Sequence, residues 1–140
     1  MVYLVYGSPC SGKSTYIKEH FKHGDIVCEL DKLYAALCFN EEHKEELYAQ
    51  EVAKELYGHL LDLIRDRKGH WHNAYVVSLA NTPDKLKAAM ERVNADEAIY
   101  IDTPYEVCIE RSKGRPFYFE FLIQEWFAEK TIGDNNGEPN

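Results

Sequence analysis

Gly7-Ser8-Pro9-Cys10-Ser11-Gly12-Lys13-Ser14-Thr15 is the stretch that decides the fold of this 140-residue chain. It satisfies the pattern G-x-x-x-x-G-K-(S/T), whose glycines let the backbone curl so that successive N–H groups point at one phosphate. An apolar run over residues 2–6 precedes it, and a helical segment over residues 13–21 follows it. A strand, this loop and a helix in that order predict a phosphate-binding loop, because the positive end of the helix also attracts an anion.

The loop pattern assigns chemistry to individual residues. Lys13 is expected to reach the β- and γ-phosphates of a bound nucleotide, and the Ser14 hydroxyl is expected to hold Mg²⁺. Cys10 lacks a His-bearing partner motif, so we interpret it as a spacer rather than a nucleophile. The alternative to a phosphate-binding loop is a turn that binds no ligand, and the flanking strand and helix disfavour it. The residues expected to bind the nucleotide are Gly7, Ser8, Pro9, Cys10, Ser11, Gly12, Lys13, Ser14 and Thr15.

Apolar and amphipathic segments alternate along the rest of the chain. The apolar runs lie at residues 2–6, 25–30, 74–79 and 98–101, and the helical segments between and after them include 41–67 and 117–130. Strands separated by helices imply βαβ crossovers. We therefore predict one three-layer α/β domain over residues 1–131, with a mainly parallel sheet of four or five strands in the order 2-3-1-4 and helices on both faces. Residues 132–140 are expected to form a disordered polar tail.

Two threonine-proline pairs predict where helices begin. Thr82-Pro83 and Thr103-Pro104 each place a hydroxyl before a proline, the arrangement of an N-cap followed by a proline in the first turn. Glu106 completes a capping box with Thr103. Both threonines are accordingly expected to cap helices, and Lys68-Gly69 is expected to end the long helix that precedes the third strand.

Composition excludes several classes of function. The chain has 16 Lys and Arg against 24 Asp and Glu, a net charge of -8, which argues against a broad surface for a polyanion such as a long nucleic acid. No apolar run approaches the length of a membrane span. The first residues lack the basic start of a signal peptide, and the four cysteines form no Cys-x-x-Cys pair. We expect a cytoplasmic protein with no membrane contact and no obvious protein partner.

At four places the chain resembles the small P-loop kinases, a family that includes the kinase half of phage polynucleotide kinase, zeta-toxin-like kinases and, more distantly, nucleotide kinases. The loop has a proline two residues after its first glycine, as in that family. Asp31 follows the second strand, where the family places an aspartate facing the acceptor hydroxyl. The other two places are Ile101-Asp102-Thr103-Pro104, similar to the fourth strand and its exit, and residues 110–116, similar to an arginine-bearing lid.

The resemblance implies a kinase that uses ATP and Mg²⁺. It would move the γ-phosphoryl group to a hydroxyl of a small molecule, a nucleoside or nucleotide, or a short nucleic-acid end such as a polynucleotide 5′ end. Asp31 would act as the base, while Lys13, Arg111 and Arg115 would stabilise the charge of the transferred group, because phosphoryl transfer depends on positioning and charge neutralisation. Lys113 would belong to the same basic cluster. The charge balance favours a small acceptor.

Some features leave alternatives open. Leu79 stands where related kinases often have an aspartate that supports Mg²⁺, and Ser78 or Asn81 could contribute a polar group instead. This departure motivates an alternative function, an ATP-binding regulatory or assembly module with little or no phosphotransfer. Asp31 could also be a helix N-cap. A fifth strand is not visible, so the base preference stays open, and the chain is too short for a motor ATPase with a helical lid domain.

Overall fold

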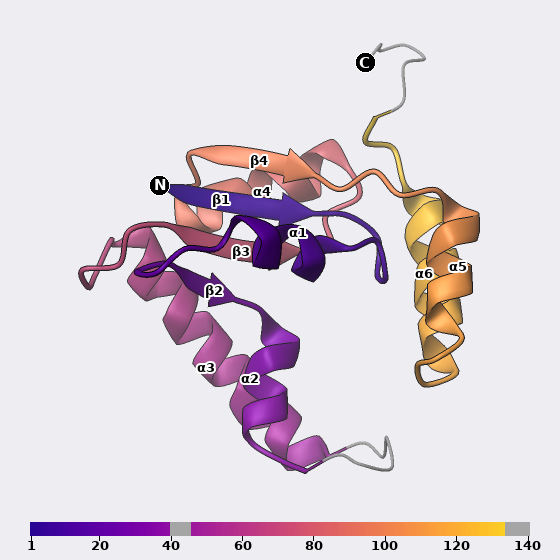
Figure 1. Cartoon of the computed structure of the whole chain (residues 1–140), viewed down its shortest axis with the longest axis horizontal. Helices are drawn as coiled ribbons and strands as arrows, with labels where there is room; N and C mark the ends of the chain where they lie inside the picture. Colours follow the sequence, from indigo (N-terminus) through magenta and orange to yellow (C-terminus); the bar gives the residue numbers. More distant parts are fainter. Residues whose placement is uncertain (40–45, 134–140) are drawn as a thin grey trace.

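The computed structural model describes residues 1–39 and 46–133 (Figure 1). Residues 41–45, the expected start of the long helix, and residues 134–140 of the polar tail expected over 132–140 lie outside these ranges. The elements in chain order are β1 (Val2–Tyr6), α1 (Lys13–His20), β2 (Ile26–Cys28), α2 (Leu30–Ala36), α3 (Leu47–Arg65), β3 (Ala74–Ser78), α4 (Pro83–Val93), β4 (Glu97–Tyr100), α5 (Tyr105–Ser112) and α6 (Tyr118–Glu129).

The sheet has four parallel strands in the order β2-β3-β1-β4, which confirms the predicted α/β fold and strand order. In the register, Leu4 of β1 pairs with Val76 of β3 on one side and Ala98 of β4 on the other. The β1 strand is central, so its side chains are covered on both faces of the sheet. Val2 and Val5 are fully buried, as expected for the continuous apolar run that predicted this strand.

Helices cover both faces of the sheet. On one face Leu61 and Ile64 of α3 and Val93 of α4 pack with Leu4 of β1. On the other face Ile17 of α1 packs with Val5 and Tyr75. The loop between β1 and α1 is therefore attached at both ends to buried elements: Val5 of β1 and Ile17 of α1 are both in the core.

The α5 and α6 helices lie side by side beyond the edge to which the strand arrows of β1 and β4 point (Figure 1). Hydrogen bonds tie α6 to the segment that follows β3. The Trp126 indole donates to the Leu79 carbonyl at 2.8 Å, and the Asn81 side-chain amide donates to the Trp126 carbonyl at 3.0 Å. The N–H of Ile132 also donates to the Asn81 carbonyl, and Ile132, the first residue of the predicted tail, is buried.

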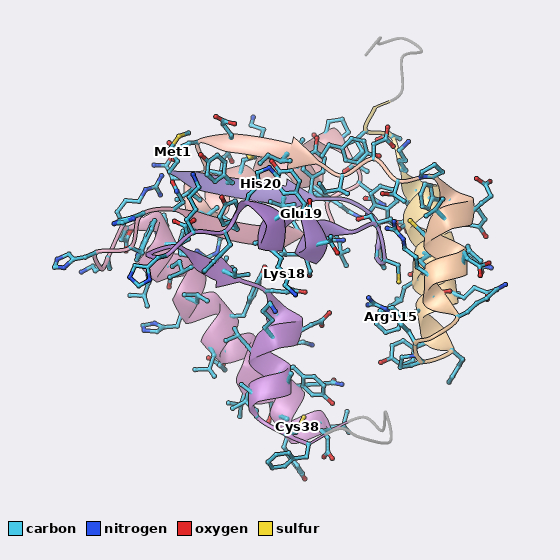
Figure 2. All side chains as sticks on the ribbon, in the orientation of Figure 1. Met1, Lys18, Glu19, His20, Cys38 and Arg115 are labelled. Atoms are coloured by element: carbon cyan, nitrogen blue, oxygen red, sulfur yellow. The ribbon has the colours of Figure 1, made fainter. Side chains whose placement is uncertain are left out.

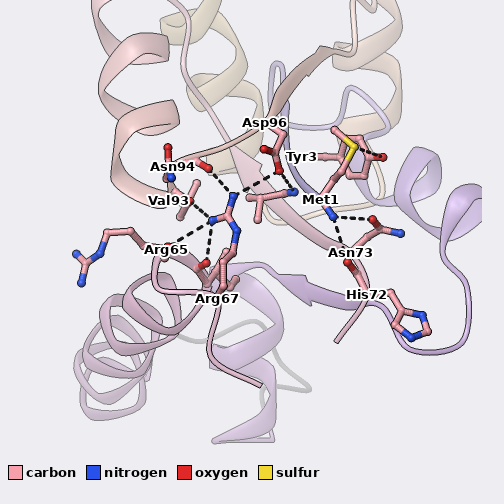
Figure 3. A network of polar contacts seen from close by, with 11 residues as sticks. Met1, Tyr3, Arg65, Arg67, His72, Asn73, Val93, Asn94 and Asp96 are labelled. Carbon is pink, nitrogen blue, oxygen red and sulfur yellow. Dashed lines mark hydrogen bonds and ion pairs between the residues drawn. The ribbon is translucent and has the colours of Figure 1, made fainter. Parts of the chain in front are cut away.

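Arg67 ties together the edge of the sheet opposite the loop (Figure 3). Its guanidinium donates to the carbonyls of Val93 and Asn94, which end α4, and lies 3.4 Å from the Asp96 carboxylate. Asp96 in turn accepts a hydrogen bond of 2.7 Å from the N–H of Val2. This network places the amino ends of β1 and β4 side by side.

The helix boundaries confirm one threonine cap and correct another. The Thr82 side chain accepts from the N–H of Lys85, as predicted for an N-cap. The prediction for Thr103 was wrong: α5 begins at Tyr105 and no cap hydrogen bond comes from the side chain at the N-cap position, Pro104. The Thr103 hydroxyl instead donates to the backbone carbonyl of Ser11 at 2.6 Å, because the end of β4 lies against the loop.

The long helix ends earlier than its sequence predicted. Its last helical residue is Arg65, with Asp66 at the C-cap position. Arg67 then adopts a left-handed φ of 55° and turns the chain, two residues before Gly69 does so with a φ of 108°. The hydrogen bonds of the Arg67 guanidinium to the end of α4 stabilise this early turn, a tertiary effect that the Lys68-Gly69 pair did not signal.

Candidate functional site

The loop over residues 7–15 is held in the curled conformation that an anion site needs. Cys10 and Gly12 have left-handed φ values of 64° and 103°. Gly7 is tightly enclosed, since a Cβ there would lie 2.8 Å from the Ile101 carbonyl oxygen. Gly12 is at the N-cap position of α1 and contributes no side-chain cap hydrogen bond. The first N–H groups of α1 and its positive end are thus available to a phosphate.

Lys13 is the buried cation of the site, with 8% of its surface exposed. Its ammonium group donates to the carbonyls of Gly7 at 3.0 Å and Ser8 at 2.6 Å. Desolvation by burial lowers the pKa of Lys13 to about 8, and the nearby Glu29 carboxylate is the largest of the effects that oppose this shift. The lysine is therefore anchored beside the loop with its charge poorly solvated, a state that a bound phosphate would relieve.

A cleft of about 480 Å³ opens in front of the loop. One wall is the loop itself with the beginning of α2, and the other is apolar and aromatic. The apolar wall comes from the end of β3, from α3 and from α6, so residues far apart in sequence meet there. The lining residues outside the loop are Glu29, Leu30, Asp31, Tyr57, Val77, Ser78, Leu79, Arg115, Tyr118, Phe119 and Leu122.

Two carboxylates enter this cleft from the start of α2. Asp31 lies in the first turn of the helix, is exposed, and lines the cleft. It is not the N-cap, because Glu29 occupies that position. Glu29 makes no cap hydrogen bond through its side chain; its two carboxylate oxygens lie 3.2 and 3.3 Å from the Ser14 hydroxyl. The sequence predicted a strand over residues 25–30 that included Glu29, whereas β2 ends at Cys28 and leaves Glu29 beyond the strand, so the sequence did not mark Glu29 as a site residue.

The basic residues of segment 110–116 separate into three environments. Arg115 lines the cleft and lies on the side of the α5–α6 pair that faces α2 (Figure 2), with its guanidinium 5.4 Å from the Phe119 ring centre. Arg111 instead supports the loop from outside the cleft lining, where its Nη1 donates to the Cys10 carbonyl at 3.3 Å. Lys113 forms an exposed ion pair with Glu110 at 3.1 Å. The expected single cluster is therefore divided.

The end of β3 supplies little polar chemistry. Leu79 is 53% exposed in the cleft wall, while the Ser78 hydroxyl accepts a hydrogen bond from the N–H of Ala80. Asn81 is buried and its amide group holds α6. Asn81 is not among the residues that line the cleft, so the suggestion that it replaces the missing aspartate at position 79 finds no support in its position.

A second, shallower depression lies along α3 and α4, away from the loop. Its volume is about 830 Å³, and two of its charged groups, Arg92 and Asp62, already pair with each other at 2.8 Å. It has no loop of N–H groups and no buried lysine. The smaller cleft combines both with two carboxylates, and we therefore place the candidate site there.

Comparison with known proteins agrees with this geometry. The model of the family AAA_33, described as an AAA domain, matches residues 2–122, which include the loop, α5 and the first part of α6. The chain belongs to this family. As an AAA_33 domain it has a P-loop nucleotide-binding fold. A search of curated proteins found no match. None of the helices in the described ranges is long and apolar enough to cross a membrane.

Proposed function

We propose that this AAA_33 domain is a kinase that transfers the γ-phosphoryl group of ATP to a hydroxyl group of a small acceptor. The observation that carries the proposal is the position of Asp31 in a cleft shared with the loop. A site for nucleotide alone needs the loop and Lys13. The same cleft is also lined by Asp31 and by apolar and aromatic side chains such as Tyr57 and Leu122, a lining that suits a second, uncharged molecule.

Different residues would bind the phosphates, accept the proton and stabilise the transferred group. The N–H groups of the loop and Lys13 bind and orient the phosphates. Asp31 orients the acceptor hydroxyl and takes its proton as the acceptor oxygen bonds to the γ-phosphorus. The bond from that phosphorus to the bridging oxygen breaks, and ADP keeps the electron pair. Arg115 lies in the cleft wall and stabilises the charge on the transferred group.

The donor atoms at Ser14 fit Mg²⁺, which prefers oxygen ligands. The Ser14 hydroxyl lies within 3.3 Å of both Glu29 carboxylate oxygens, so a hard-oxygen site exists beside the first turn of α1. When bound with the nucleotide, Mg²⁺ would neutralise part of the phosphate charge. Ser14 is the residue we assign to hold it.

The acceptor class follows from the charge and the walls of the site. The chain carries a net charge of -8, and the cleft wall opposite the loop is apolar and aromatic. Both features favour a small, neutral alcohol, such as a nucleoside, over a long nucleic acid. A short strand end could enter, but the described basic residues outside the cleft would offer its backbone little attraction.

The test is transfer of labelled phosphate from γ-labelled ATP to a panel of nucleosides, sugars and 5′-hydroxyl oligonucleotides. We expect labelled product with at least one neutral alcohol. In Asp31→Asn the transfer should fall by about 10²- to 10⁴-fold while ATP affinity stays nearly unchanged, because a carboxamide cannot accept the proton. ATP binding without transfer to any acceptor would instead support the regulatory or assembly module.

A further inference from the structure

The side chain of Glu29 is placed for a task other than holding its own helix. Glu29 is the N-cap residue of α2, and its backbone carbonyl accepts from the N–H of Lys32. Its carboxylate makes no cap hydrogen bond and extends to Ser14, 15 positions earlier in the chain. Glutamate is not among the residues preferred at an N-cap, which are Ser, Thr, Asp and Asn. The contact with Ser14 therefore points to a role for the Glu29 side chain at the phosphate-binding loop.

We infer that Glu29 supplies a carboxylate oxygen to the divalent cation that Ser14 holds. Glu29 thereby replaces the aspartate that related kinases often have at the position of Leu79. The inference rests on the proposed function, because the cation is the one bound with the nucleotide. Neighbouring ligands around an octahedral Mg²⁺ lie about 2.9 Å apart, from Mg–O distances of about 2.0–2.1 Å. The 3.2 Å between the Ser14 hydroxyl and Glu29 Oε1 is close to this spacing.

The sheet explains why a residue after β2 can take a role expected after β3. The two strands pair in parallel, with Cys28 beside Val76, so both end at the same edge of the sheet. Glu29 follows β2 directly, while Leu79 follows β3. Both line the same cleft. A carboxylate at either position could therefore approach a cation at Ser14.

Electrostatics favours a cation between Glu29 and the nucleotide. Glu29 lies 3.2 Å from the hydroxyl of Ser14, the residue that follows Lys13 in the loop. The loop brings phosphates to the same place, and a carboxylate next to a phosphate is repelled. A divalent cation between them turns this repulsion into attraction. Glu29 should therefore make nucleotide binding depend on the metal, whereas a carboxylate that only neutralised Lys13 would not.

The experiment measures ADP binding by calorimetry with Mg²⁺ and with EDTA, and Mn²⁺ binding in the presence of ADP by electron paramagnetic resonance. We expect Mn²⁺ to bind Glu29→Gln about 10- to 100-fold more weakly than it binds the wild type. With EDTA present, Glu29→Gln should bind ADP at least as tightly as the wild type, because the repulsion is removed. Glu91→Gln, an exposed change on α4, is the matched control.

Two other results would contradict the role of Glu29, and they differ in what they imply for the proposed function. Equal Mn²⁺ affinity in Glu29→Gln and wild type, with both binding ADP, would overturn the role of Glu29 and leave the proposed function standing. Absence of ADP binding by the wild type would overturn both. Should Glu29→Gln fail to fold, Mn²⁺ bound with ADP to wild-type protein labelled with ¹³C at the glutamate carboxyl carbons should show, by pulsed electron paramagnetic resonance, the ¹³C hyperfine coupling of a directly bound carboxylate, and absence of this coupling would contradict the inference.

Discussion

The Thr103 hydroxyl donates a hydrogen bond of 2.6 Å to the backbone carbonyl of Ser11, although the two residues lie 92 positions apart in the sequence. The bond links the exit of β4 to the middle of the phosphate-binding loop. Next to it, the enclosed Gly7 contacts Ile101, the residue that follows β4. The curled loop is therefore supported by the neighbouring strand and not by its own sequence alone.

Thr103→Asp should distinguish this bond from helix capping. Aspartate is a better N-cap than threonine but has no hydrogen to donate to the Ser11 carbonyl. We expect Thr103→Asp to lower the free energy of unfolding by about 1–3 kcal/mol, the cost of leaving that carbonyl unpaired. Urea unfolding without nucleotide measures it. Thr103→Ser, which keeps the donor, should stay close to the wild type, and a more stable Thr103→Asp would contradict the assignment.

Lys13 should make nucleotide affinity depend on pH. Its pKa in the unliganded protein is lowered to about 8 by burial, and bound phosphate should raise it again. Below pH 8 the ammonium form already exists, so affinity for ADP is constant. Above pH 8 binding must take up a proton, and affinity falls by up to about tenfold per pH unit until the pKa of the complex is reached.

Calorimetry measures this proton directly. At about pH 9, titration of ADP in two buffers of different ionisation enthalpy should give apparent enthalpies that differ by the protons taken up. Lys13→Met, which has no titrating group, is the control and should show no uptake at that pH. Constant affinity of the wild type as the pH rises from about 7 to about 10 would show that the pKa of Lys13 is not lowered.

Two glycine substitutions should change stability in opposite directions. A Cβ at Gly58, within α3, would meet no atom within 4 Å, so Gly58→Ala should add about 0.5–1 kcal/mol by restricting the unfolded chain. Gly12 has a left-handed φ, and its Cβ would lie 3.3 Å from the Arg111 guanidinium. Gly12→Ala should cost about 1–2 kcal/mol and weaken ADP binding. Thermal unfolding and calorimetry test both, and equal signs would refute the argument.

Substitution of Arg111 and substitution of Arg115 should affect phosphotransfer, ADP affinity and stability differently. Arg115→Ala should lower phosphotransfer by about 10²- to 10³-fold with a smaller effect on ADP affinity, because Arg115 lines the cleft and does not contact the loop backbone in the described contacts. Arg111→Ala should weaken ADP binding and stability together, because Arg111 holds the Cys10 carbonyl. Indistinguishable effects of the two variants on affinity and rate would contradict this division.

Much of the fold was predictable from the sequence. The strand-loop-helix context identified the phosphate-binding loop, and apolar runs separated by helices predicted a parallel sheet; the strand order predicted for it is the order observed. The cap at Thr82 was also predicted, because its hydroxyl bonds to Lys85 only three residues away. The loop and the cap depend on neighbours in the chain, where residue type and spacing are sufficient.

The roles of Thr103, Glu29 and the arginines were less predictable. Thr103 has the local pattern of a cap, yet its hydroxyl donates to the Ser11 carbonyl in the loop. Residues 111 and 115 are four apart in the sequence, but one supports the loop from outside and the other enters the cleft. A short helix end and a turn separate them, and no sequence pattern specifies how such a turn is oriented against a distant element.

The sequence by itself determined that this chain forms a parallel α/β domain with a phosphate-binding loop, because loop curvature and strand burial follow from local residue types. Only the tertiary structure decided which side chains share the cleft. Glu29 meets Ser14 because β2 ends at the same edge of the sheet as β1, and the apolar wall forms because Trp126 ties α6 to Leu79. Such contacts join residues far apart in the chain, and their geometry depends on how whole elements pack.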